Sequence, residues 1–229
     1  MSSKKVAISQ SNYIPWIGYF DLLGSVDTFV IYDDVQFTRR DWRNRNRIKT
    51  PQGPRWLTIP IESKGNYFSK ISDMQVSDSN WAEKHWKTLE HNYAKAPRFA
   101  EVQEWLKGAY ETVSSRNLSA INQHFLERIL EKLGISTEIL LSSSFQLPED
   151  RNERLLTICK YVGATEYVSG PAAKSYLNED VFDSARIRVN WFEYANYPEY
   201  QQLWGDFEPN LSIVDFIFNV TKIDVWARK

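Results

Sequence analysis

Two short apolar runs, separated by a helical pattern, open the chain. Residues 5–9 (KVAIS) and 28–32 (TFVIY) have the length and the composition of buried strands. Between them, the apolar residues of 17–25 (IGYFDLLGS) recur at helical spacing. Since a strand, a helix and a second strand in this order form a βαβ unit, the opening predicts a parallel sheet, and such sheets bind ligands beyond the carboxyl ends of their strands.

The rest of the chain continues this alternation, interrupted by one long helical stretch. Further strands are predicted at 55–61, 71–76, 139–142, 167–169 and 186–193. Helices are predicted at 80–93, 98–114, 118–133, 153–162 and 211–219. Pro60 makes the strand at 55–61 an edge strand or ends it, because proline cannot donate a ladder hydrogen bond. The order predicts a single α/β domain over 1–229, with a mostly parallel central sheet flanked by helices and a helical insertion at about 78–134.

Composition is that of a soluble globular protein. Of the 229 residues, 42% are hydrophobic and 25% are charged, and the formal net charge of −1 argues against a nucleic-acid partner. The single cysteine, Cys159, excludes a disulfide within the chain. No apolar run reaches the ~18 residues of a membrane span, and the first residues lack the apolar region of a secretion signal. We therefore expect a cytoplasmic protein with no membrane span.

A concentration of charge follows the second predicted strand. Asp33 and Asp34 come directly after its apolar core, and six basic residues lie within 39–49, where Asp41 alone offsets them. Like charges repel each other by about 1 kcal/mol per close pair even in water, so the segment favours an anionic partner. Because the chain as a whole is not basic, we expect that partner to be a small phosphorylated molecule.

Within this segment, the sequence WRNRNRI alternates arginine with asparagine. The arginines are Arg43, Arg45 and Arg47, and the asparagines are Asn44 and Asn46. In an extended segment the arginines would share one face and the asparagines the other. The planar guanidinium grips phosphate through paired hydrogen bonds, so the arginine face predicts an anion site, and Asn44 is a further candidate contact of the ligand. Trp42 and Ile48 bracket the run, and we expect both to be buried, which argues against a merely solvated basic strand.

The two adjacent aspartates can have different roles. Strand geometry directs Asp33 and Asp34 to opposite faces of the sheet, so at most one of them faces a cleft. That carboxylate could be a general base, a ligand of a divalent metal or an acceptor for a sugar hydroxyl. The structural alternative is a salt bridge to the nearby arginines.

A polar and aromatic loop, residues 10–19, follows the first predicted strand. The amides of Gln10 and Asn12 can pair with a base, a sugar or a carboxylate, and the rings of Tyr13 and Trp16 can stack on a ligand. The alternative is a polar turn whose aromatic side chains point into the core.

Three further features indicate a site more weakly. Ser169 and Lys174 belong to a second loop at a strand end, where backbone N–H groups and a lysine can bind an anion. His85 is a candidate base in a predicted helix, although the three histidines have no metal-binding spacing. Asp215 is an acid inside an apolar helix, so it needs a buried partner, and we expect one of the arginines.

The combined motifs resemble those of the WbqC-like family. They are QSNYIPWIGYFDLL, DTFVIYDDVQFTRRDWRNRNRIKTPQG, WLTIPI, YVSGPAAKSYL and LSIVDFIFN, and they run through almost the whole chain. The family's usual Gln-Pro-Asn-Tyr opening is replaced by Gln10-Ser11-Asn12-Tyr13, so a rigid proline is missing while the polar groups remain. The resemblance implies a role in bacterial O-antigen or other surface-polysaccharide biosynthesis, and therefore work on an activated, nucleotide-linked sugar.

Three functions follow as hypotheses. In the first, the chain transfers an acyl or aminoacyl group from a donor to the amine of a nucleotide-linked amino sugar. Asp33, Asp34 or His85 would take the proton of the amine, and the arginines would hold the diphosphate. The second is an adenylate-forming ligase or nucleotidyltransferase that requires ATP and Mg²⁺, and the third is a non-catalytic accessory protein that binds a nucleotide sugar. Beyond that ATP and Mg²⁺ the sequence names no cofactor or metal, and the oligomeric state stays open, with a homodimer as one option.

Overall fold

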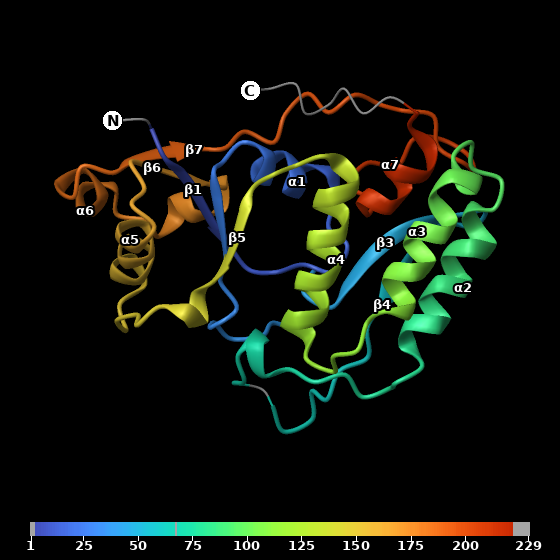
Figure 1. The fold of residues 1–229 in the computed structure, drawn as a ribbon, viewed down its shortest axis with the longest axis horizontal. Coiled ribbons are helices and arrows are strands. Elements are labelled where there is room, and N and C mark those ends of the chain that lie inside the picture. Colours follow the sequence, from blue (N-terminus) through green and yellow to red (C-terminus); the bar gives the residue numbers. More distant parts are fainter. Residues whose placement is uncertain (1–2, 67, 222–229) are drawn as a thin grey trace.

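Figure 1 shows the layered α/β fold of the computed structural model, which describes residues 3–66 and 68–221. The strands of the central sheet are β1 (Lys5–Ser9), β2 (Thr28–Ile31), β5 (Glu138–Leu141), β6 (Glu166–Ser169) and β7 (Arg188–Trp191). They lie in the order β5-β2-β1-β6-β7, and every neighbouring pair is parallel. The predicted α/β class and the parallel sheet are thereby confirmed.

The sheet grows outward from β1 in two directions. The chain passes from β1 to β2 and then to the edge strand β5, and later returns to the other side of β1 for β6 and β7. Val6 of β1 therefore lies between Thr28 of β2 and Tyr167 of β6. In open parallel sheets, ligands bind at the point where the strand order reverses. Here that point is at the carboxyl ends of β1 and β6.

Helices cover both faces of the sheet. They are α1 (Ile17–Gly24), α2 (Trp81–Tyr93), α3 (Phe99–Glu111), α4 (Leu118–Leu133), α5 (Arg151–Tyr161), α6 (Glu179–Ser184) and α7 (Ile213–Asn219). On one face, Ala7 and Phe29 belong to a core shared with α1 to α4 and α7. On the other, Val6 and Val30 belong to a core shared with α5 and α6. Both sides of the strands are apolar because both are covered, as in other parallel sheets.

A two-stranded antiparallel hairpin stands apart from the central sheet. It pairs β3 (Arg45–Thr50) with β4 (Gly53–Thr58), so the strand predicted at 55–61 belongs to this hairpin and ends before Pro60. The predicted alternation is present, because the asparagine side chains of 44 and 46 are buried while the arginines of 45 and 47 are half-buried. The hairpin thus presents its arginines on one face. Asn44, a predicted ligand contact, is instead buried and donates from Nδ2 to the carbonyl oxygen of Ile59 at 2.8 Å.

The prediction of a strand at 71–76 is wrong. The structure has a short 3₁₀ helix there, η1 (Ile71–Asp73), which is tied to the segment after β2. Ser72 N–H donates to the carbonyl oxygen of Asp33 at 3.0 Å, and Ile71 N–H donates to that of Val35 at 2.9 Å. The buried apolar residues that suggested a strand instead anchor a connection, and its partner is too distant in sequence for a local pattern to reveal.

A long connection without regular structure, residues 192–212, joins β7 to α7, and we call it the strap. Tyr200 of the strap donates to Asp215 Oδ1 at 2.8 Å, and Tyr93 of α2 donates to Asp215 Oδ2 at 2.7 Å. The predicted arginine partner of Asp215 is therefore wrong, since two phenols satisfy the buried acid. Burial raises the pKa of the Asp215 carboxyl, which the two phenols partly offset.

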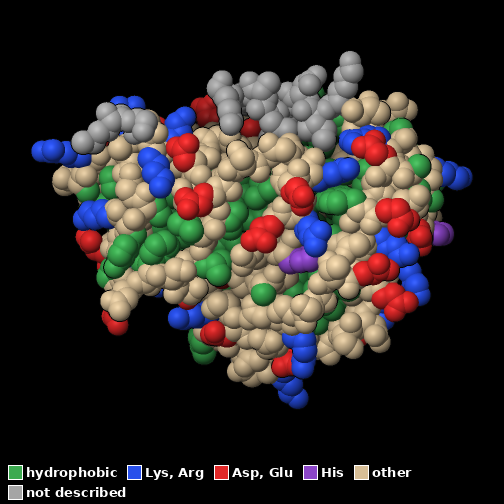
Figure 2. All heavy atoms as spheres, in the orientation of Figure 1, with side chains coloured by type: hydrophobic (Ala, Val, Ile, Leu, Met, Phe, Trp, Pro, Cys, Tyr) green, Lys and Arg blue, Asp and Glu red, His purple; other side chains and the backbone are tan. Residues whose placement is uncertain are grey.

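The surface has mixed charge. Acidic and basic side chains are intermingled on the face shown in Figure 2, and hydrophobic side chains gather on it near α5. Within 3–66 and 68–221, no helix combines the length and the apolar character that a membrane crossing requires.

Candidate functional site

The loop after β1 is held in place by a buried carboxylate. Asp33 Oδ1 accepts from the backbone N–H of Ser11 at 2.8 Å, and Oδ2 accepts from the Ser11 hydroxyl at 2.6 Å and the Ser119 hydroxyl at 2.5 Å. Asp33 is 3% exposed. It ties the end of β2 to the loop and to α4, so its geometry is that of a positioning residue.

Arg43 orients two amide side chains beside this clamp. Its guanidinium donates to Gln10 Oε1 at 2.9 Å, to Asn12 Oδ1 and to the carbonyl oxygen of Ser11 at 3.3 Å. Because a guanidinium has donors and no acceptor, both amides turn their oxygen toward Arg43 and their NH₂ group away from it. In the described part of the chain, these two NH₂ groups donate to no protein acceptor. Two half-buried hydrogen-bond donors next to a fixed cation are suited to bind an anion.

A pocket of about 360 Å³ lies beside the loop. It is lined by Asn12, Pro15, Trp16, Trp42, Asn46, Arg47 and Asn210. Its volume is within the range of small-molecule sites. We call Gln10, Asn12 and Arg43 the Arg43 cluster. Asn12 belongs both to this cluster and to the pocket wall, so the proposed anion-binding groups adjoin the pocket.

Strained backbone shapes the loop at the pocket. Ile14 has a φ of 36°, a value that β-branched residues rarely adopt. The carbonyl oxygen of Ile14 accepts from Asn46 Nδ2 at 3.0 Å and from the Ser212 hydroxyl at 2.7 Å. The buried asparagine of the hairpin therefore holds the unfavourable conformation, and such strain tends to occur at functional sites.

The three arginines of the run do not surround one anion. Arg43 precedes β3 and holds the loop, whereas Arg45 stacks on Trp56 with its guanidinium carbon 4.0 Å from the ring centroid. Arg47 reaches the pocket and pairs with Glu208 of the strap at 2.9 Å. The three arginines therefore do not form the single anion-binding face that the alternation predicted, because each of them contacts a different neighbour.

Tyr13 and His85 lie in the core, which corrects the predictions of ring stacking for Tyr13 and of catalysis for His85. The Tyr13 hydroxyl lies 2.9 Å from His85 Nδ1 and 2.6 Å from the Tyr110 hydroxyl. His85 Nε2 faces the carbonyl oxygen of Thr58 at 3.2 Å, so Nε2 carries the proton and Nδ1 accepts from Tyr13. Burial lowers the pKa of His85 to about 4. A neutral, fully bonded histidine in the core is a structural group.

Trp42, rather than Trp16, offers an open ring to the pocket. The Trp16 ring is packed against Tyr194 and Tyr197, at centroid distances of 5.5 and 5.4 Å. A Cβ at Gly18 would lie 2.3 Å from Cζ2 of Trp16, so glycine is required beneath this ring. Trp42 is 40% exposed, and the prediction that it is buried is wrong. Its neighbours in sequence, an aspartate and an arginine, were the signal that it lies at a surface.

Asp34 is the carboxylate that remains accessible. It accepts from the Ser142 hydroxyl, and Lys70 Nζ lies 3.9 Å from Oδ1. Its side chain keeps 17% of its surface exposed. The two aspartates therefore do face different surroundings, and Asp34, which does not line the pocket, has the more exposed carboxylate.

The second strand-end loop is not part of the pocket lining. Ser169 is buried and donates to the Tyr167 hydroxyl at 3.3 Å. Lys174 is exposed and lies 5.4 Å from the centroid of the Trp191 ring. Both residues lie across the sheet reversal from the Arg43 cluster. The pocket wall thus brings together the predicted contacts Asn12, Trp16 and Arg47 with Trp42 and Asn46, which were not predicted as ligand contacts, and Gln10 joins them through Arg43.

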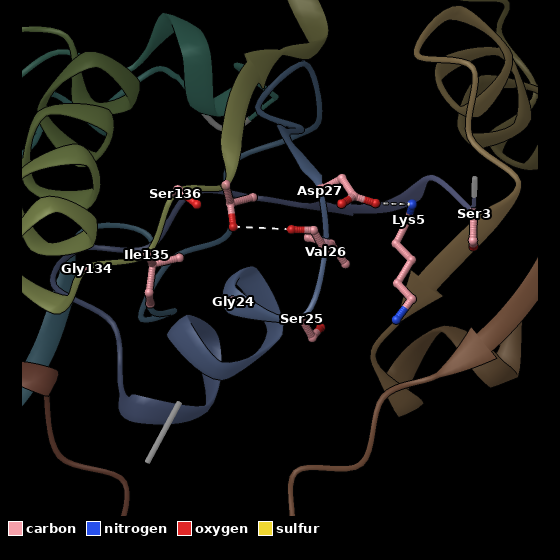
Figure 3. Close-up of a pocket in the computed structure, with 10 residues that line it drawn as sticks. Ser3, Lys5, Gly24, Ser25, Val26, Asp27, Gly134, Ile135 and Ser136 are labelled. Atoms are coloured by element: carbon pink, nitrogen blue, oxygen red, sulfur yellow. Dashed lines mark hydrogen bonds between the residues drawn. The ribbon is translucent and has the colours of Figure 1, made fainter. Parts of the chain in front are cut away.

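A larger cavity, of about 620 Å³, lies at the amino ends of the central strands, at the opposite end of the sheet from the pocket (Figure 3). Lys5, Asp27 and Ser136 line it, at or before the amino ends of β1, β2 and β5. Its carboxylate already accepts a hydrogen bond, since Asp27 Oδ2 takes the backbone N–H of Lys5 at 2.7 Å. Parallel sheets bind ligands at the carboxyl ends of their strands, which is the end where the 360 Å³ pocket lies. In residues 3–66 and 68–221, neither cavity contains a cluster of three metal-binding side chains.

Comparison with known proteins gives a family but no activity. A model of the WbqC-like protein family matches residues 10–225. A protein of Mycobacterium tuberculosis, named uncharacterized protein Rv1507c, is 52% identical over 217 residues, which are 95% of this chain and 94% of that protein. No solved structure matches.

Proposed function

The chain belongs to the WbqC-like protein family, and we propose that it transfers an acyl or aminoacyl group to the amine of a nucleotide-linked amino sugar. The proposed site is the 360 Å³ pocket and the adjoining loop at the carboxyl end of β1. Such a product would serve bacterial surface-polysaccharide biosynthesis, the role that the family resemblance implies.

The observation that supports the proposal best is the Arg43 cluster. One guanidinium fixes Gln10 and Asn12 so that two amide NH₂ groups point away from it toward a ligand. A diphosphate would gain these donors and the charge of Arg43. Arg47 would add a second cation once its partner Glu208 is displaced. The amide groups of the loop would also meet sugar hydroxyls.

The amine nucleophile needs a base, and Asp34 is our candidate. The nitrogen forms a bond to the carbonyl carbon of an activated acyl donor, such as an acyl phosphate or a thioester, and the bond from that carbon to the leaving group breaks. The proton lost by the amine passes to the Asp34 carboxylate and then to the departing group. Asp33 would act indirectly, by holding the loop through Ser11.

Product mass tests this proposal. The wild-type chain, incubated with a panel of amino-sugar nucleotides and activated acyl donors, is expected to increase the mass of one sugar nucleotide by the acyl group. Asp34→Asn should abolish turnover while retaining binding, and Asp183→Asn, at an exposed aspartate of α6, is the matched control. Unchanged mass across a broad panel would contradict the transferase. Saturable binding without turnover would instead favour an accessory protein.

A second candidate function is adenylate formation or nucleotidyl transfer. The strand order favours it, because the reversal between β1 and β6 is where α/β sheets bind nucleotides. It would require ATP with Mg²⁺, which is typically held by the phosphates and one or two carboxylates, and Asp34 could supply one. Release of pyrophosphate from ATP with an organic acid would support this function, and its absence across a panel of acids would exclude it.

A further inference from the structure

Two tryptophan side chains form an open platform beside the pocket. Trp42 and Trp56 are each 40% exposed, and their ring centroids are 5.3 Å apart with a tilt of 42°. Tryptophan is usually well buried, and its exposure in pairs is typical of binding surfaces. We call these two residues the indole shelf.

The shelf is continuous with the pocket. Trp42 is part of the pocket wall, and its carbonyl oxygen accepts from the backbone N–H of Tyr13 at 3.1 Å, which fixes it to the loop after β1. Trp56 pairs with Arg47 across the hairpin, and Arg47 lines the same pocket. The part of a bound ligand that extends out of the pocket would therefore contact the shelf.

Positive charge accompanies the two rings. The Arg45 guanidinium lies 4.0 Å from the centroid of the Trp56 ring. Arg45 Nε is buried and has no hydrogen-bond partner among the described residues. Arg40 is exposed, and its carbonyl oxygen accepts from the Arg45 guanidinium, so it lies beside the stacked pair. The surroundings favour a ring that is attached to phosphate over a neutral apolar partner.

The shelf is too small for a protein partner. A tryptophan side chain offers about 250 Å² at most, so two rings that are 40% exposed present roughly 200 Å². A stable protein interface needs about 800 Å² on each partner. The area suits one planar ring.

We propose that the indole shelf holds the nucleobase of the nucleotide sugar, a proposal that rests on the proposed function. The ligand would place its sugar toward the loop after β1, its diphosphate between Gln10, Asn12 and Arg47, and its base on Trp42 and Trp56. Stacking recognises the face that all bases share, so the site would hold the base without reading its edge. The chain would accept several nucleoside diphosphates with similar affinity.

Calorimetric titration with four nucleoside diphosphates (uridine, thymidine, guanosine and adenosine), a hexose 1-phosphate and inorganic pyrophosphate tests the shelf. Trp56→Ala should weaken every nucleoside diphosphate about tenfold, and leave the hexose 1-phosphate and pyrophosphate unchanged. Trp56→Phe should recover most of the affinity, which separates loss of stacking from misfolding. Tyr161→Ala, at an exposed aromatic residue of α5, is the matched control. In the wild-type chain, the four nucleotides should bind within about threefold of one another.

Three results would overturn the shelf alone. They are nucleotide affinity that does not depend on Trp56, an equal loss for the hexose 1-phosphate, which would place a sugar on the shelf, and a preference of more than tenfold for one base. If no nucleoside diphosphate binds the wild-type chain, the proposed function fails together with the shelf.

Discussion

Replacing Asp33 by asparagine tests whether this aspartate is a positioning group. The change keeps the shape but removes the charge and replaces one oxygen by NH₂. If the amide oxygen keeps the Ser11 N–H, the NH₂ group faces the hydroxyls of Ser11 and Ser119, which now donate to Oδ2. The Ser11 hydroxyl already accepts from Asn122 Nδ2 at 2.9 Å, so it can accept from the new NH₂ group only through its second lone pair, with its own hydrogen turned away from residue 33. Both bonds to Oδ2 lose the charge of the carboxylate.

A hydrogen bond to a charged group contributes about 1.5–3 kcal/mol, so we expect Asp33→Asn to lower the free energy of unfolding by about 3 kcal/mol. The urea midpoint, followed by circular dichroism, should fall by roughly 1 M. The same variant should bind pyrophosphate more weakly, because Gln10 and Asn12 lose their anchored loop.

Asp34→Asn is the matched control for this experiment. Its carboxylate is partly exposed and bonds to one hydroxyl and a lysine at 3.9 Å. Exposed ion pairs contribute about 0–1 kcal/mol, so stability should change little. Equal unfolding free energies for the two variants would refute the assignment of Asp33 as the buried clamp.

Three further outcomes are expected. The stability advantage of the wild type over His85→Gln, measured as the difference between their free energies of unfolding, should fall by about 3 kcal/mol as the pH drops from 6.5 to about 4, because in that range the histidine binds a proton mainly in the unfolded chain. A difference that does not change with pH in urea titrations would contradict the buried neutral histidine. Glu208→Gln should raise pyrophosphate affinity two- to fivefold in calorimetry, because Arg47 loses its half-exposed partner, and unchanged or weaker binding would argue against a role for Arg47 in the site. Burial raises the pKa of the Cys159 thiol to about 12, so a thiol reagent at pH 8 should label it only as the chain unfolds, and rapid labelling of the native chain would disprove its burial.

The central sheet could be predicted from sequence because its strands are short apolar runs between helical patterns. Lys5–Ser9 and Leu118–Leu133 have the predicted bounds, and each depends on local periodicity alone. The segment at 71–76 could not be predicted, because hydrogen bonds to the end of β2 decide its conformation.

The candidate site could be predicted in part. Gln10, Asn12 and Arg43 were candidates, and they do lie together because two segments that follow neighbouring strands meet at one sheet edge. The burial of Tyr13 and the exposure of Trp42 depend on which face of a loop packs against the core. A chain without regular periodicity does not encode that choice locally.

The most direct measurement is a crystal structure of the chain with a bound amino-sugar nucleotide. We expect the diphosphate within hydrogen-bond distance of the Gln10 and Asn12 amide nitrogens, with the ligand filling the pocket lined by Trp42 and Arg47. A ligand bound instead in the cavity at the amino ends of β1, β2 and β5 would contradict the proposed site.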